Sequence, residues 1–281
     1  MGESEGNAEG VRATIEYVSP HSTSHVRYVC RGQEANTAVF EPHEVFIRDA
    51  RRAPAPMTLE TCGFELARHD SAVDFYDDAR AEADYAAEIE PLLLSITGAD
   101  RAVLFSSRRR HRTRPQGDVM TTASDVHVDY TAEDSQLFAQ GLLGKEGRHG
   151  MPYRRYMAVN LWRMLSAPPQ DYPLAICDGR SVATQSGSPN ALVPVKTMPR
   201  REEMLGKPPK NTHSVFLFHH DPEHRWYYYP NMTPGEVLLF KLYDSTETGP
   251  WRCPHVSFSD PTVKDAAPRE SYEIRSFVYF K

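Results

Sequence analysis

The amino-acid sequence predicts a mainly β fold, a double-stranded β-helix (jelly roll) with N-terminal helices and short strands packed on it. Beyond residue 100, short segments rich in Val, Phe, Tyr, Leu and Ile alternate with segments rich in Pro, Gly and Asn, as strands alternate with turns. Only one helical segment interrupts them. The chain of 281 residues is 40% hydrophobic and 25% charged, which is an ordinary globular composition. Many short strands with few helices between them are typical of an antiparallel sandwich or a jelly roll.

The domain organisation is expected to be simple. Residues 1–10 are polar and acidic and are expected to form a disordered tail. Residues 11–281 are expected to form a single domain, because no repeat, low-complexity segment or linker divides them. Within this domain, residues 11–100 would form an α/β cover and residues 101–281 the jelly-roll core.

The clearest helix of the cover is predicted over residues 71–97. Ser71 is a plausible N-cap, apolar residues recur at helical spacing, and Gly98 ends the pattern. Pro91 lies inside this stretch and is expected either to kink the helix or to start a second short one.

The expected core strands share a high content of β-branched and aromatic residues. They lie at residues 102–106, 125–130, 156–162, 173–178, 213–220, 225–229, 236–243, 254–260 and 271–280. Thr131 and Asp134 resemble a capping box, which predicts a helix directly after the second of these strands.

Composition excludes several classes of protein. The net charge of −6 argues against nucleic acid as a partner, and the basic run from Arg108 to Arg112 is too short to change this. No apolar stretch reaches the length of about 18 residues that a membrane span needs, and the N-terminus lacks the features of a secretory signal. The sequence therefore indicates a cytoplasmic protein that acts on a small molecule; it does not indicate the oligomeric state.

The cysteines point to the same compartment. The chain has four scattered cysteines and no CxxC pair, so that neither a disulfide framework nor structural zinc is expected. The four expected reduced thiols are Cys30, Cys62, Cys177 and Cys253.

The first chemical signal is the pair His127 and Asp129. On a strand, residues i and i+2 point to the same face, so that an imidazole and a carboxylate could hold one metal ion together. Two histidines and one carboxylate leave positions open for substrate, cosubstrate and O₂, which is the ligand set of non-haem iron(II) oxygenases. Taken alone, such a pair is more often two polar residues on a surface strand.

The second histidine ligand has several candidates among the twelve histidines of the chain. His255 begins a late strand, and His219 and His220 end another. We select His255 because of the residues that follow it along the chain.

Those residues are Arg269 and Ser271. A buried guanidinium can hold the far carboxylate of 2-oxoglutarate with two parallel hydrogen bonds, and a hydroxyl two residues on can add a third. Arg275 is the rival anchor on the same strand face. Phe277 and Tyr279 continue that face, which favours the interior of the barrel over a solvent-exposed edge.

At these positions the sequence resembles the AsaB/CmcJ-like hydroxylase/desaturase family, which includes the 7α-cephem methoxylase component, fungal hydroxylase/desaturases and gibberellin-desaturase-like proteins. The resemblance covers roughly residues 35–281. It is carried by GFELARHDSAVDFYDD (63–78), VHVDYT (126–131), NLWR (160–163), PLAICD (173–178), HRWYYYPNMTPGEVLLFKLYDS (224–245), PHVSFSDP (254–261) and PRESYEIR (268–275).

The resemblance implies an iron(II)- and 2-oxoglutarate-dependent enzyme of specialised metabolism. It assigns His127, Asp129 and His255 as metal ligands and Arg269 as the residue that holds 2-oxoglutarate. Met164 stands where the family often has proline after NLWR, a departure that would affect a loop on the substrate side and not the metal.

Further polar and aromatic residues beside these motifs are candidates for substrate contact, although most such residues serve the core or the surface. The candidates are Tyr130, Asn160, Trp162, Arg163 and Arg252. Asn160 is the strongest, because it interrupts an otherwise apolar strand.

The expected reaction is oxidation of an unactivated C–H bond of a small specialised metabolite, by hydroxylation, desaturation or oxidative cyclisation, with O₂ consumed and succinate and CO₂ released. Two alternatives remain at this stage. One is a cupin-type metal enzyme that does not use 2-oxoglutarate, and the other is a non-catalytic barrel that binds a small molecule.

Overall fold

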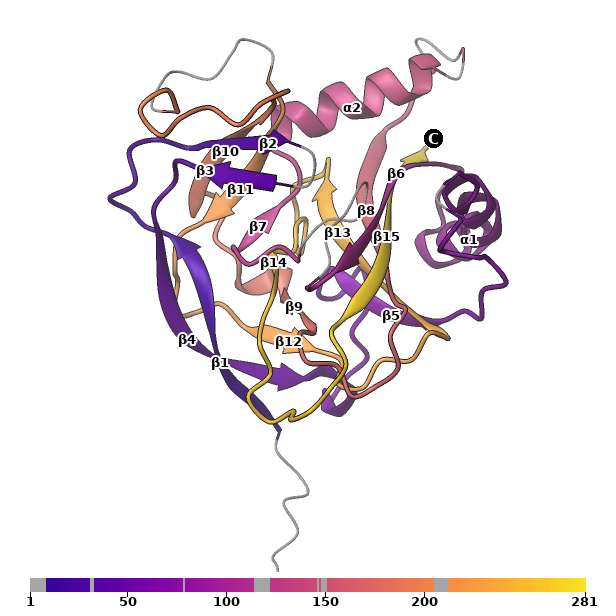
Figure 1. Cartoon of the computed structure of the whole chain (residues 1–281). Coiled ribbons are helices and arrows are strands. Elements are labelled where there is room, and N and C mark those ends of the chain that lie inside the picture. Colours follow the sequence, from indigo (N-terminus) through magenta and orange to yellow (C-terminus); the bar gives the residue numbers. More distant parts are fainter. Residues whose placement is uncertain are drawn as a thin grey trace, which may run out of the picture.

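The computed structural model describes residues 9–30, 33–77, 79–113, 122–145, 147, 151–204 and 212–281. These residues form two β-sheets and two α-helices (Figure 1). The expectation of a mainly β protein is confirmed.

The larger sheet contains ten strands. In spatial order they are β1 (Gly10–Val18), β4 (Phe40–Asp49), β12 (Trp226–Tyr228), β9 (Leu174–Cys177), β14 (His255–Ser257), β7 (His127–Val128), β11 (Ser214–Phe218), β10 (Gly187–Pro194), β2 (Val26–Cys30) and β3 (Gln33–Asn36). The N-terminal strands thus extend both edges of this sheet instead of forming a separate layer.

The smaller sheet contains five strands, in the order β5 (Phe64–Arg68), β13 (Glu236–Asp244), β8 (Arg155–Met164), β15 (Glu270–Phe280) and β6 (Arg101–His111). Helix α1 (Ala81–Thr97) covers the outer face of this sheet, and α2 (Ala132–Lys145) lies across one end of the molecule (Figure 1). Two single 3-10 turns, Ala50–Arg52 and Gly179–Ser181, complete the described elements.

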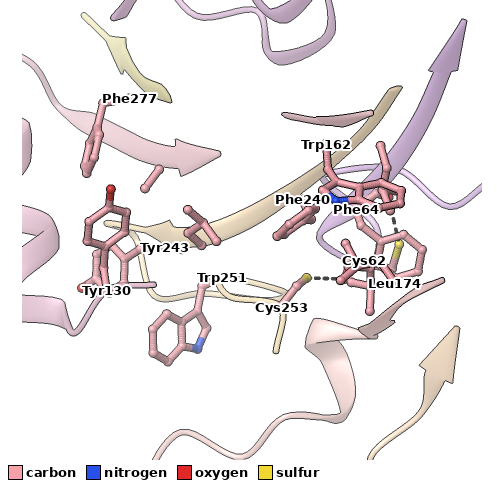
Figure 2. Close-up of a cluster of buried hydrophobic side chains, with 14 of the residues drawn as sticks. Cys62, Phe64, Tyr130, Trp162, Leu174, Phe240, Tyr243, Trp251, Cys253 and Phe277 are labelled. Atoms are coloured by element: carbon pink, nitrogen blue, oxygen red, sulfur yellow. Dashed lines mark hydrogen bonds between the residues drawn. The ribbon is translucent and has the colours of Figure 1, made fainter. Parts of the chain in front are cut away.

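Side chains of both sheets meet in a central apolar cluster (Figure 2). Trp162 and Phe240 of the smaller sheet pack there with Leu174 of the larger one. The intervening residues of β8, Val159 and Leu161, point the other way and pack with the apolar side chains of α1. Strand β8 is therefore buried on both faces, which explains why its sequence is almost continuously apolar.

The helix of the cover differs from its prediction at the N-terminal end. Helix α1 begins at Ala81 and not at Ser71, because Asp74 and Asp77 accept hydrogen bonds from the backbone N–H groups two residues on and so favour local turns over the helix. It continues through Pro91, so that no second helix starts there. Gly98 ends it as predicted, with φ 65° and its N–H bonded to the carbonyl of Leu94.

Other features follow the sequence more closely. The hydroxyl oxygen of Thr131 accepts a hydrogen bond from the N–H of Asp134 at 3.1 Å, as a cap of α2. All four cysteines are free and buried. Residues 1–8 of the expected tail lie outside the described residues, and β1 already begins at Gly10. Among the described helices, none is long and apolar enough to cross a membrane.

Candidate metal and cosubstrate site

His127 and His255 lie directly opposite each other on the neighbouring antiparallel strands β7 and β14. Cross-strand partners point to the same face of a sheet, and the centroids of the two rings are 4.5 Å apart. Asp129 follows just after β7. One ligand atom from each of the three residues lies within 4.8 Å of the others, and no other such group occurs in the described part of the chain.

The second nitrogen of each imidazole ring lies near a backbone carbonyl. His127 Nδ1 is 2.7 Å from the carbonyl oxygen of Asp125, and His255 Nδ1 is 3.3 Å from that of Cys253. A carbonyl oxygen can only accept, so that Nδ1 carries a hydrogen and Nε2 is the nitrogen that remains for a metal. This is the arrangement that metal-binding histidines use.

Asp129 is held by Arg275, whose Nε donates to Oδ2 at 2.7 Å. Its other oxygen, Oδ1, lies 3.6 Å from His127 Nε2. Burial alone would raise the pKa of Asp129, but the Arg275 charge outweighs it and holds the pKa well below the usual range. The carboxylate is therefore ionised, with one oxygen oriented and the other available. Two neutral imidazoles and one carboxylate fit a divalent transition-metal ion.

Arg269 lies in a small pocket on one side of the three ligand residues, over the ring of Trp162. It is 1% exposed, and its Nη1 donates to the Tyr172 carbonyl at 3.0 Å and to Ser257 Oγ at 2.8 Å. Its Nε has no hydrogen-bond partner among the described residues. Burial, together with the charge of Arg110, lowers its pKa to about 9. A buried guanidinium whose described hydrogen bonds all go to neutral acceptors fits an anionic ligand.

The hydroxyl that contacts Arg269 belongs to Ser257 and not to Ser271. Ser271 is fully buried on β15, and its Oγ has no partner in the described part of the chain. Ser257 was missed at the sequence level, although it follows His255 at i+2 and therefore shares its face. The same parity argument that joins His127 to Asp129 would have found it.

Three of the expected substrate residues lie near the site. Trp162 borders the Arg269 pocket. Tyr130 lies on the opposite side of Asp129. Asn160 lies between Phe240 and Arg275 in the smaller sheet, and its buried Oδ1 has no described hydrogen-bond partner.

The other two expected substrate residues have structural contacts. Arg163 points to the opposite face of β8, where it donates to the carbonyl oxygens of His69 and Pro234 beneath α1. Arg252 donates to the carbonyl oxygens of Ala183 and Thr184. For Arg163 the reason is strand parity, because it alternates with Trp162 and Met164.

The rival histidines also lie elsewhere. His219 Nδ1 is 3.0 Å from the carbonyl oxygen of Val18. His220 stacks on His43, with ring centroids 4.0 Å apart. Neither belongs to the metal-ligand group.

Two further cavities also border Asp129, and the first of them shares Arg110, Ala123, His127 and Asp129 with the Arg269 pocket. The basic cavity, of about 270 Å³, is bordered by Arg27, Val29, Glu34, Arg108, Arg110, Thr122, Ala123, His127, Asp129, Leu192, Pro194, Val215 and Arg275. The aromatic cavity, of about 220 Å³, is bordered by Phe105, Ser106, Arg108, Asp129, Tyr130, Phe138, Leu192, His213, Ser214, Val215 and Arg275.

Comparison with known proteins agrees with this geometry. A family model described as an oxidoreductase/YMDC permease-like domain matches residues 15–279. The Fe(II)/2-oxoglutarate-dependent dioxygenase nvfI of Aspergillus novofumigatus is 32% identical, over 88% of this chain and 87% of its own. The hydroxylase/desaturase efuI of Hormonema carpetanum is 29% identical, over 96% and 95% of the two chains.

A solved structure, of the iron and alpha-ketoglutarate-dependent endoperoxidase NvfI, is similar with a TM-score of 0.80 at 30% identity, over 96% of this chain and 97% of that one. The resemblance to hydroxylase/desaturases noted from the sequence is thereby confirmed. The chain belongs to this oxidoreductase family, whose relatives are iron(II)- and 2-oxoglutarate-dependent dioxygenases and hydroxylase/desaturases.

Proposed function

We propose that this protein is an iron(II)- and 2-oxoglutarate-dependent oxygenase that oxidises an unactivated C–H bond of a small specialised metabolite. The function, the enzyme class and the need for iron(II), 2-oxoglutarate and O₂ agree with the relatives. A cupin-type enzyme without 2-oxoglutarate and a non-catalytic barrel are not favoured by them. We further propose that the two sheets form a double-stranded β-helix and that the enzyme acts in the cytoplasm, with neither nucleic acid nor membrane as a partner.

In this proposal His127 Nε2, Asp129 Oδ1 and His255 Nε2 hold the iron. When bound, iron and 2-oxoglutarate together supply O₂ activation for C–H oxidation, with release of succinate and CO₂. The residues of the chain orient these groups: the carbonyl oxygens behind the two imidazoles fix their tautomers, and Arg275 fixes the carboxylate.

Arg269 would hold the far carboxylate of 2-oxoglutarate. Ser257 and the Tyr172 carbonyl fix one nitrogen of its guanidinium, so that the remaining donors are oriented before the ligand arrives. Trp162, Leu174 and Phe240 border the same pocket and exclude water from it, which strengthens the ion pair.

The single observation that carries the proposal is that three metal-ligand side chains converge beside a buried arginine whose guanidinium is bonded to no carboxylate in the described part of the chain. A structural arginine buried to this degree is normally paired with a carboxylate, as Arg275 is.

The proposal is tested by anaerobic titration of the metal-free protein with iron(II) and then with 2-oxoglutarate. We expect a weak visible charge-transfer band that requires both, and succinate on admission of air. The matched control is His219→Ala, which should behave like the native protein, whereas His255→Ala should show no band. Iron binding without any response to 2-oxoglutarate would contradict the proposal.

A further inference from the structure

A β-bulge in β6 controls which side chains face the site. Phe105 is paired with Arg275 and Arg108 with Glu273, so that the two intervening residues of β6 oppose Ile274 alone. Ser106, the first residue of the bulge, has a φ of 55°. That left-handed conformation is unfavourable for a residue other than glycine, and it is the kind of local strain that accompanies functional sites.

The bulge changes the alternation of the strand. A regular strand that turns Phe105 inward would also turn Ser107 and Arg109 inward. With one extra residue, Arg108 and Arg110 turn toward the cavity instead, although Arg108 stays exposed to solvent. Arg109 lies on the outer face beside Tyr76. Bulges next to active sites commonly re-aim side chains in this way.

The arginines of the basic cavity differ in their partners. Arg27 pairs with Asp125 at 2.6 Å, and Arg110 pairs with Glu273 at 2.9 Å. Arg275 pairs with Asp129, as described above. Arg108 makes no ion pair with any described carboxylate, and its Nη1 donates a hydrogen bond to the carbonyl oxygen of Ser107 at 2.6 Å. One guanidinium of this wall is therefore left for a ligand.

Arg108 also borders the aromatic cavity, so that it stands where the two cavities join. The aromatic cavity offers stacked rings: the centroids of Phe105 and Phe138 are 6.0 Å apart, and those of Tyr130 and Phe138 are 5.2 Å apart. Both cavities touch Asp129. A ligand that spans the junction would place part of its body next to the metal ligands.

We propose that the substrate is amphipathic, with an apolar body of ring size in the aromatic cavity and an oxyanion such as a carboxylate bound by Arg108. This inference rests on the proposed function and names the substrate class for the same site. Arg27 pairs with Glu34 as well as with Asp125, Arg110 pairs with Glu273, and Arg275 pairs with Asp129. Arg108 is therefore the arginine of this wall without a described carboxylate partner, and it can pair with one oxyanion of the substrate.

The test uses three variants of the intact protein, loaded anaerobically with iron(II) and 2-oxoglutarate. The probes are 2-naphthylacetate and abietate, each compared with its primary amide, which has the same shape without the charge. Dissociation constants are read from the change in the charge-transfer band and in tryptophan fluorescence. Arg108→Gln removes the inward charge, Arg109→Gln is the matched control on the outer face of the same strand, and Arg108→Lys keeps the charge.

We expect at least one acid to bind about tenfold more tightly than its amide, and Arg108→Gln to abolish this preference. Arg109→Gln should keep the preference, and Arg108→Lys should keep part of it. If amides bind as well as acids, or if Arg108→Gln weakens both equally, the inference is wrong. If the inference fails but the charge-transfer band still forms in every variant, the proposed function stands. If the band is absent from the native protein, the proposed function itself is wrong.

Discussion

Arg269 directly precedes the last strand and Arg275 lies in the middle of it. Both lie near the metal-ligand group, but their partners differ. Arg275 donates to the carboxylate of Asp129. Among the described residues, the guanidinium of Arg269 donates only to a carbonyl and a hydroxyl and keeps an unpartnered Nε. The two pKa values reflect this: burial lowers that of Arg269 to about 9, whereas the Asp129 charge overcomes burial and raises that of Arg275.

The difference indicates which arginine serves a ligand. A guanidinium that is already hydrogen-bonded to a carboxylate orients its partner, and a guanidinium that is hydrogen-bonded only to neutral acceptors is prepared for an anion. Arg275 is therefore a positioning residue for Asp129, and Arg269 is the candidate anchor for 2-oxoglutarate. Sequence alone left these two open.

The largest expected effect comes from the three metal-ligand residues. His127→Ala, Asp129→Ala and His255→Ala should each abolish turnover, because each removes one of three ligands from an open site. The measurement is iron binding and succinate release, with circular dichroism to show that the fold persists. Loss of iron binding in His219→Ala or His220→Ala, with His255→Ala unaffected, would reassign the distal ligand.

Arg269→Lys should raise the KM for 2-oxoglutarate by about tenfold or more, because an ammonium cannot reproduce the planar fork and one charge-assisted hydrogen bond is lost. Iron affinity without 2-oxoglutarate should change little. Steady-state kinetics and anaerobic iron titration separate the two. A larger rise of this KM in Arg275→Lys than in Arg269→Lys would exchange the roles of the two arginines.

Arg275→Lys should act on the metal instead. Loss of the Nε hydrogen bond frees the Asp129 carboxylate to reorient, and loss of such an outer partner typically weakens metal affinity or activity by about tenfold or more. The readout is the iron dissociation constant, together with the fraction of 2-oxoglutarate consumed without product. An unchanged iron affinity would mean that the Arg275–Asp129 contact has no positioning role.

The smallest expected effect distinguishes two serines. Ser257→Ala should raise the KM for 2-oxoglutarate roughly threefold to tenfold, because it removes one hydrogen bond that orients Arg269. Ser271→Ala is the matched comparison, since its hydroxyl touches no described partner. If Ser271→Ala has the larger effect, the hydroxyl contacts the cosubstrate directly and the original Arg269–Ser271 pairing is correct.

The parts of the site that sequence could predict are those set by strand parity. His127 and Asp129 are two residues apart, and the strands that carry His127 and His255 are rich in β-branched and aromatic residues. Which strands are neighbours is a tertiary property, so the sequence did not predict that His127 and His255 are cross-strand partners. His255 could be selected as the second ligand only because Arg269 follows it. Parity also explains the error at Arg163, which shares a strand with Trp162 but not a face.

The remaining differences have local causes that a pattern does not show. The bulge at Ser106 shifts alternation by one residue, and nothing in AVLFSSRRR indicates where the extra residue falls. Strand β10 was not predicted, because Gly187 and Pro189 are turn residues and because its parallel partner β2 comes from a distant part of the chain. The substrate side therefore required the structure, whereas the metal side did not.

The most direct test of the assignment is a crystal structure of the protein with manganese(II), in place of iron(II), and 2-oxoglutarate under anaerobic conditions. We predict the metal on His127 Nε2, Asp129 Oδ1 and His255 Nε2, with the far carboxylate of 2-oxoglutarate on Arg269 and Arg275 still bound to Asp129. A metal held by His219 or His220, or a cosubstrate carboxylate bound to Arg275, would contradict it.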